Sequence, residues 1–293
     1  MKSVHQWAKG IVDWVHEDTA YISVVFTWHL PKAYSLCTWY RQQGYQVKAG
    51  GVAVKLLPDY LADVAMTGED AHALPLHNPD ATFTSRGCIR NCGFCAVPKI
   101  EGGLVELTDW EPRPIVCDNN LLACSKAHFD RVIDRLKPLQ GIDFNQGLDA
   151  RLLQQHHIDR FKELDLSVLR FAWDNTSSER RVLPAIHSIL DAGFPKQKVR
   201  CYVLFNCGDT LEDALYRCNT LKQMGVLPNV QRYQPLYTLQ KNSYVDPNWN
   251  KDLLSDFGRY WSKQIWLRPI PFEDYRRCRR HDMAKEQQVM ELA

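Results

Sequence analysis

Hydrophobic positions follow two alternating spacings through the middle of the chain. From residue 81 onward, short runs rich in β-branched and aromatic residues predict strands, and apolar stripes at helical spacing between them predict helices. One helix is predicted over 210–225, where Thr210 and Asp213 fit a capping box and Gly225 fits the C-terminal stop. The apolar stripes consist of Leu211, Ala214, Leu215, Cys218 and Leu221 in this helix, and of Phe129, Val132, Ile133 and Leu136 in an earlier one. The alternation predicts an α/β fold with right-handed crossovers and a parallel sheet.

Six strands are predicted in this part of the chain. Their sequences are ATFTS, IVCDNN, IDFNQG, SVLRFAWD, KVRCYVLFN and VQRYQPLYT. Six is two short of the eight strands that close a TIM barrel, so we expect an open or incomplete barrel over residues 81–237. After Tyr237 the alternation stops, which indicates a separate C-terminal cap over 238–293.

The region before the predicted barrel reads as a small α/β unit. YISVVFTW predicts a strand, PKAYSLCTWYRQQG a helix that begins at Pro31 and ends at Gly44, and YQVKAGGVAVKLL a second strand. Residues 58–80 carry scattered Pro, Gly, Asp and Asn without clear period, and are expected to form a connector. We therefore assign residues 1–80 to this unit and its connector.

Composition narrows the class of protein. The chain has 293 residues, 45% of them hydrophobic, which suits one large domain with or without a small appendage. It contains no apolar run long enough to span a bilayer and no signal-peptide pattern at its start, so we expect a cytoplasmic protein without a membrane partner. Ten cysteines in a cytoplasmic chain favour metal binding or chemistry over disulfides. A net charge of +2 does not by itself indicate a polyanionic partner.

Polar side chains follow every predicted barrel strand. In parallel α/β folds, ligands bind at the carboxyl ends of the strands, so these residues predict a polar ligand site on one rim. A simpler interpretation is that Asn, Asp and Gly merely terminate strands. The residues are Arg86, Asp118, Asn119, Asn120, Asn145, Gln146, Asp174, Asn175, Asn206, Asp209, Arg232 and Gln234.

Three cysteines lie close together after the first predicted barrel strand, in CIRNCGFC. Cys88, Cys92 and Cys95 have a spacing that would also suit a buried helical stripe. The glycines at 87 and 93 and the proline at 98 disfavour a helix, so we expect a chelating loop. Structural zinc usually has four ligands, and a redox CxxC would leave Cys88 unexplained. An iron–sulfur cubane held by three thiolates would leave one iron free for another ligand.

CIRNCGFC resembles the CxxxCxxC signature of the radical S-adenosylmethionine (SAM) superfamily, including the aromatic Phe94 before the third cysteine, and the six strand–helix units are similar to the partial TIM-like barrel of that family. The resemblance implies an incomplete (β/α)6 barrel with one 4Fe-4S cluster on Cys88, Cys92 and Cys95. It implies that the free iron binds the amino and carboxylate groups of SAM, and that reductive cleavage gives a 5′-deoxyadenosyl radical, which abstracts hydrogen from substrate. The electron would come from a donor such as flavodoxin or ferredoxin.

The same resemblance assigns the SAM-binding residues. The family usually has a Gly-Gly-Glu-like motif after the second strand, where this chain has CDNN, so Asp118 and Asn119 are the candidates for the methionine amino group. For the ribose or carboxylate the candidates are Asn145, Gln146 and Asp174, and near the adenine they are Gly93 and Phe94. Structural capping stays an alternative for each of the five polar residues.

The N-terminal unit resembles a shortened version of the Rossmann-like domain found in cobalamin-binding and methylthiotransferase-like members. Cobalamin members often carry Asp-x-His-x-x-Gly, but TWHLPKA offers only His29, so cobalamin is open but not favoured. Methylthiotransferases need three further N-terminal cysteines, whereas only Cys37 precedes the signature, so a single cluster is expected. Cys117 or Cys207 could instead quench a substrate radical.

The C-terminal cap combines basic and aromatic residues. FGRYWSKQIWLRPIPFEDYRRCRRHD contains seven Lys or Arg and three acidic residues. Such a segment could bind nucleic-acid phosphates and stack on bases, or its aromatics could pack over the open side of the barrel, which we favour. A nucleobase or nucleic acid is the first expected substrate, ahead of a peptide or small metabolite. The alternative from another class is a non-catalytic, metal-binding nucleic-acid module.

Overall fold

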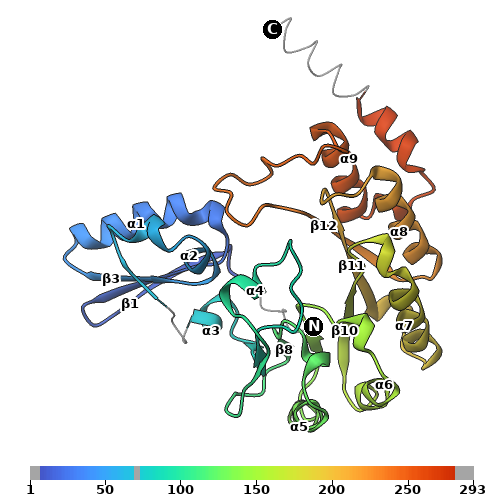
Figure 1. Cartoon of the computed structure of the whole chain (residues 1–293), viewed down its shortest axis with the longest axis horizontal. Helices are drawn as coiled ribbons and strands as arrows, with labels where there is room; N and C mark the ends of the chain where they lie inside the picture. The colour runs from blue at the N-terminus through green and yellow to red at the C-terminus, as the bar shows by residue number, and fades with distance from the viewer. Residues whose placement is uncertain (1–6, 69–72, 281–293) are drawn as a thin grey trace, which may run out of the picture.

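The computed structural model describes residues 7–68 and 73–280, which form two large sheets with helices packed against them and a small two-stranded sheet (Figure 1). The first sheet has the order β1-β2-β3-β4, in which β1 pairs antiparallel with β2 and the other pairs are parallel. Its strands are β1 (Ile11–His16), β2 (Thr19–Val24), β3 (Gln46–Gly50) and β4 (Met66–Thr67). Helices α1 (Leu30–Gln42) and α2 (Val52–Leu56) pack on it and share a separate hydrophobic core.

The second sheet is entirely parallel, in the order β12-β11-β10-β9-β8-β5. Its strands are β5 (Ala81–Thr82), β8 (Ile115–Val116), β9 (Ile142–Phe144), β10 (Leu166–Ala172), β11 (Val199–Phe205) and β12 (Leu227–Arg232). Figure 1 shows the helices between the later strands along one side of this sheet. They are α5 (Lys126–Leu136), α6 (Gln155–Phe161), α7 (Glu179–Asp191) and α8 (Leu211–Gln223). The predicted α/β class with a parallel sheet is confirmed.

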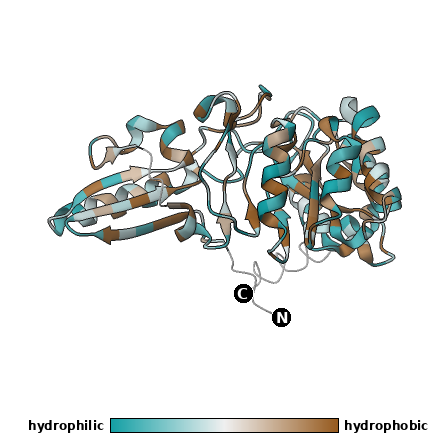
Figure 2. Ribbon diagram, turned by 90° about the horizontal axis from the view of Figure 1, so that it is seen from below, coloured by the Kyte–Doolittle hydropathy of each residue, from teal (hydrophilic) through white to brown (hydrophobic). Residues whose placement is uncertain are grey.

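The predicted helical stripes account for the main core. Phe129, Val132, Ile133 and Leu136 of α5 are all fully buried, and α8 begins at the predicted Thr210–Asp213 capping box. In α8 the stripe is buried at Ala214, Cys218 and Leu221, but only half-buried at Leu211 and Leu215. Figure 2 shows the strands of this sheet as largely hydrophobic, while the helices alternate between hydrophobic and hydrophilic residues. This pattern is expected when helices cover a sheet that has little contact with water.

Short elements connect the two sheets and the loops. Strands β6 (Ser85–Arg86) and β7 (Val105–Glu106) form an antiparallel pair around the cysteine loop, and α4 (Val97–Ile100) lies inside that pair. Helix α3 (Ala73–His77) contacts both β1 and β5. The short 3-10 helices are η1 (Thr27–His29), η2 (Pro58–Leu61), η3 (Leu121–Ala123), η4 (Ala150–Leu152), η5 (Thr176–Ser178), η6 (Lys196–Lys198) and η7 (Ile265–Leu267).

Two predictions for the N-terminal unit are wrong in detail. The strand predicted over 45–57 ends at Gly50, and α2 follows it. The cause is Gly51, which has a φ of 94° and lies so close to β2 that a β-carbon there would be 2.6 Å from the Val24 carbonyl oxygen. The predicted connector also contains η2, β4 and α3, and β1 was not predicted at all. Strand β1 has the pattern IVDWVH, in which acidic and aromatic residues obscure the alternation.

The N-terminal unit contacts the β5 edge of the six-stranded sheet and the loop that follows β12. On the β5 side, α3 contacts the edge strand, and the His77 ring lies 3.0 Å from the Ser23 hydroxyl of β2. On the β12 side, the Thr27 hydroxyl donates a hydrogen bond of 2.6 Å to the Thr238 carbonyl in the loop after that strand. The unit is therefore joined to the first strand of the sheet and to the loop after the last one.

The aromatic residues of the C-terminal cap are mostly buried. The cap contains α9 (Lys251–Ser262) and a second helical segment over 272–280, and α9 packs against β12. Its buried aromatics are Trp249, Phe257, Tyr260, Trp261, Trp266 and Phe272. Arg276, Arg279 and Arg280 form ion pairs with the buried Asp256. These contacts favour the packing role of the cap over base stacking. His281 and Asp282 of the basic segment lie outside the described residues.

In residues 7–68 and 73–280, none of the helices combines the length and apolarity needed to cross a membrane.

His157 predicts a pH dependence of stability. Its ring is 5% exposed, packs on Phe129, and accepts a hydrogen bond of 3.1 Å from the Gln154 N–H, and burial lowers its pKa from 6.5 to about 4. The unfolded chain therefore binds a proton that the folded chain excludes, so stability is full above pH ~6.5 and falls as the pH drops toward about 4. Between pH ~7.5 and ~5 we expect this residue to remove about 2 kcal/mol from the free energy of unfolding, measured by urea denaturation. His157→Gln should show a smaller loss, because glutamine does not titrate; an equal loss would contradict the assignment.

Candidate functional site at the carboxyl edge of the parallel sheet

The three cysteines lie on a loop, as predicted, and a carboxylate holds its base. Cys88, Cys92 and Cys95 fall between β6 and α4, where the backbone is irregular. Glu101 accepts hydrogen bonds from the Arg86 guanidinium at 2.6 Å and the Gly87 N–H at 2.8 Å, and the Cys88 N–H bonds to the carbonyl at 102. Both oxygens of this carboxylate are used, so it joins the two ends of the loop.

The cysteine sulfurs share one pocket with the ends of four parallel strands. The pocket has a volume of about 230 Å³. It is lined by Cys88, Arg90, Cys92, Phe94, Cys95, Asn119, Asn120, Gln146, Gly147, Leu148, Asp149, Ala150, Arg151, Ala172, Asp174, Asn175, Ser178 and Val182. These residues follow the carboxyl ends of β5, β8, β9 and β10. The fold therefore places the cysteine loop where a parallel sheet binds ligands.

Four predicted SAM-binding residues line this pocket: Phe94, Asn119, Gln146 and Asp174. The structure does not bring the predicted Gly93, Asp118 or Asn145 into the lining that it describes. The Asn145 carbonyl instead accepts a hydrogen bond of 3.0 Å from the Tyr202 hydroxyl. The ends of β11 and β12, which were expected on the same rim, also lie outside this lining.

The Asp118 carboxylate is buried and hydrogen-bonded to neighbouring residues of the protein. It is 4% exposed and accepts hydrogen bonds from the Thr84 N–H at 2.6 Å, from the Thr84 hydroxyl, and from the Ser85 hydroxyl at 2.8 Å. Burial raises its pKa, although these hydrogen bonds oppose the shift. A carboxylate whose oxygens are already used between β5 and β8 is poorly placed to bind an amino group, so its assignment as a SAM ligand gains no support.

Sequence reasoning missed a charged cluster on the other side of the pocket. The Asp149 carboxylate accepts hydrogen bonds from Arg151 Nε at 2.6 Å and Nη2 at 3.0 Å, and from Arg90 Nε at 3.1 Å. Burial acts to raise the pKa of Asp149, but the hydrogen bonds and charges of these arginines outweigh it and hold the pKa low. The signal was the sequence LDAR directly after the glycine that ends IDFNQG. The cluster gives the pocket two guanidinium groups and one carboxylate.

Asp174 is the most perturbed acid of the pocket. Burial raises its pKa to about 6, against the opposing positive charges of Arg217 and Arg151. Its backbone is fixed from behind by the fully buried Arg217, whose guanidinium donates to the carbonyls of Asp174 at 3.0 Å and Leu204 at 2.8 Å. Arg217 also forms a 2.5 Å ion pair with Asp209. These bonds tie the end of β10 to the end of β11.

The donor set is chemically suited to an iron–sulfur cluster, since three thiols line one pocket. All ten cysteines are free thiols, and Cys88 Sγ accepts contacts from the Arg90 N–H at 3.3 Å and the Asn120 amide at 3.5 Å, as a thiolate ligand would. Burial raises the pKa of the Cys92 and Cys95 thiols. In the part of the chain that the structure describes, no three His, Cys, Asp or Glu side chains are already arranged around one metal position. Cluster assembly would therefore have to draw the three sulfurs together.

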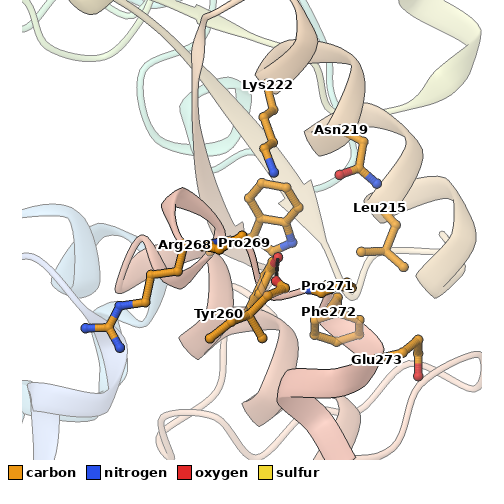
Figure 3. Close-up of a pocket in the computed structure, with 11 residues that line it drawn as sticks. Leu215, Asn219, Lys222, Tyr260, Arg268, Pro269, Pro271, Phe272 and Glu273 are labelled. Carbon is orange, nitrogen blue, oxygen red and sulfur yellow. Dashed lines mark hydrogen bonds between the residues drawn. The ribbon is translucent and has the colours of Figure 1, made fainter.

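A second cavity lies outside the predicted site. It has a volume of about 490 Å³ and lies between α8 and the C-terminal cap. Figure 3 shows Leu215, Asn219 and Lys222 on one helix, facing Tyr260 and Phe272. None of the predicted site residues is in its lining.

Comparisons with known proteins add no assignment: no family model, no curated protein and no solved structure matches the chain.

The backbone conformation at Gly87 makes a side chain at this position of the cysteine loop unfavourable. It has a φ of 73°, and a β-carbon would lie 2.0 Å from the carbonyl oxygen of Gly103. Gly87→Ala should lower the free energy of unfolding by roughly 1–3 kcal/mol, because the left-handed conformation and this contact both resist a side chain. Gly93 offers a control in the same loop, since a β-carbon there meets no atom within 4 Å. Urea denaturation of both variants should show a loss confined to Gly87→Ala; equal stability of the two would contradict this explanation.

Proposed function

We propose that the protein is a radical SAM enzyme with an incomplete barrel, in which Cys88, Cys92 and Cys95 hold a single 4Fe-4S cluster. The observation that carries the proposal is the shared pocket: the three thiols of the CxxxCxxC motif open onto the same space as polar residues from the ends of β8, β9 and β10. Cysteines kept for packing would be expected inside a core, as Cys201 and Cys218 are, with no exposed surface.

When bound, the cluster would supply the electron that cleaves SAM to methionine and a 5′-deoxyadenosyl radical. The chain's own residues would bind and orient SAM. Asn119, whose amide donates to Glu101 at 2.8 Å, lies beside the cysteine loop with Asn120.

The guanidinium groups of Arg90 and Arg151, which pair with Asp149 in this structure, would suit the carboxylate of SAM. Phe94 offers an apolar face for the adenine. The volume of about 230 Å³ lies below the usual range of about 300–1,000 Å³ for small-molecule pockets, so binding requires lining side chains to move.

The proposal includes a reductant and a place in the cell. An electron donor such as flavodoxin or ferredoxin would reduce the cluster, and the setting would be the cytoplasm. Cobalamin is not needed for this scheme. A non-catalytic nucleic-acid module is the less favoured reading, because the cap aromatics that would stack on bases are buried.

An anaerobic assay tests the proposal. Protein reconstituted with iron and sulfide and reduced with dithionite should convert SAM to 5′-deoxyadenosine, detected by chromatography, even without substrate. The matched control is the same protein left unreduced, which should form none. Protein that retains stoichiometric zinc and forms no 5′-deoxyadenosine when reduced would refute the enzyme assignment.

A further inference from the structure

A basic groove adjoins the cysteine pocket. It has a volume of about 410 Å³, within the usual range of small-molecule sites. Its lining comes from η4, α6 and α7 and the turn between the first two. Three arginines, Arg151, Arg180 and Arg181, contribute to this lining, and no carboxylate does. The remaining polar groups are the amides of Gln154 and Gln155 and the hydroxyl of Ser188. Such a surface suits an anion.

The groove and the cysteine pocket are adjacent. Ala150 and Arg151 line both, so a molecule bound in the groove would lie next to the cysteine pocket. Asp149 already binds the Arg151 guanidinium from the pocket side and holds it at the boundary between the two spaces. The position of Arg151 is therefore fixed before any ligand arrives.

In the described part of the chain, the guanidinium groups of the other two arginines are free to bind an anion. Arg180 and Arg181 are exposed on the first turn of α7, and across the described ranges neither forms an ion pair or a side-chain hydrogen bond. A first turn of a 13-residue helix also adds the positive end of its dipole. Two uncompensated guanidinium groups with planar donor pairs match the geometry of phosphate oxygens better than that of a neutral ligand.

We infer that this groove binds a phosphate group of the substrate, while the reacting part of that substrate faces the cysteine pocket. Calling the bound molecule a substrate rests on the proposed function. Binding of phosphate in the groove does not require SAM cleavage. The phosphate could belong to a mononucleotide-type metabolite or to a nucleic-acid strand, which share this chemistry.

Binding assays on the full-length, reconstituted protein test the inference with three probes: inorganic phosphate, adenosine 5′-monophosphate and a fluorescent single-stranded RNA decamer. The double variant Arg180→Gln/Arg181→Gln is compared with Lys32→Gln/Lys251→Gln, which removes the same charge from exposed positions on α1 and α9. We expect the first variant to weaken binding at least tenfold, and the second less than twofold. For RNA, the slope of log K against log salt should become shallower by about 0.7 in the first variant, because the groove binds one phosphate and about 0.7 is lost per phosphate contact.

The probes distinguish a phosphate of a small metabolite from a phosphate of a nucleic-acid strand. Tight RNA binding that the monophosphate does not displace at millimolar concentration identifies a strand, whereas monophosphate binding that RNA does not exceed identifies a metabolite. Equal weakening in both double variants, no weakening in the first, or no binding of any probe would overturn the inference. SAM cleavage is scored separately, so retained phosphate binding without 5′-deoxyadenosine would refute the proposed function and leave the groove assignment standing.

Discussion

Cys92→Ala protein is expected to lose the brown absorbance of the reconstituted cluster and nearly all 5′-deoxyadenosine formation. Cys92 lies in the pocket between the other two motif thiols in sequence, and its removal leaves two protein ligands for a cubane that needs at least three. Iron and sulfide analysis after anaerobic reconstitution measures the first effect, and chromatography the second. We expect iron content at least tenfold below that of the unsubstituted protein.

Cys218→Ala is the matched control for this prediction. Cys218 is fully buried in α8, and burial raises its pKa far above the ordinary thiol value, so it is a core residue rather than a ligand. Its substitution should leave iron content and absorbance unchanged, at a stability cost of roughly 1 kcal/mol for the lost sulfur. Equal loss of iron in both variants would mean that the ligand set is wrong. Full iron content in Cys92→Ala would mean the same.

Arg217→Met is expected to lower the free energy of unfolding by roughly 3–5 kcal/mol, the largest stability effect that we predict. The substitution leaves the Asp209 carboxylate, 9% exposed, without its 2.5 Å partner. It also removes the guanidinium group that donates hydrogen bonds to the backbone carbonyls of Trp173, Asp174 and Leu204. Urea denaturation monitored by circular dichroism measures the change.

A double variant separates the unpaired charge from lost packing. Arg217→Met/Asp209→Asn should recover part of the loss, because the buried charge is gone while the methionine is unchanged. Arg277→Met serves as the surface control, since its side chain is 80% exposed, and should change stability by less than about 0.5 kcal/mol. A loss at Arg217 no greater than at Arg277 would refute the role assigned to the buried guanidinium.

The strands and helices of the larger sheet could be predicted because their signals are local. Four of the six predicted strands are short apolar runs that end at Asn, Asp or Gln, and Thr210 and Asp213 mark the start of α8. The sixth strand was predicted over 230–238, but β12 spans Leu227–Arg232. The cysteine loop was predictable for the same reason, since a glycine precedes the first thiol and the motif is contiguous. The shared pocket then followed from the rule that parallel strands place their carboxyl ends on one edge.

What could not be predicted depends on contacts distant in sequence. Asp118 was expected to bind a ligand, but Thr84 and Ser85, more than thirty residues earlier, use its oxygens. The strand β3 ends where Gly51 meets the Val24 backbone, a contact that no local pattern records. The Asp149 cluster was missed because Arg90, on the cysteine loop, supplies one of its partners from 59 residues away.

The contact of α3 with the edge of the large sheet has a practical consequence. A shortened chain beginning near residue 81 would uncover β5, a two-residue edge strand that α3 otherwise contacts. Such a chain would also lose the packing of α3 between β1 and β5, so the chain should be expressed whole.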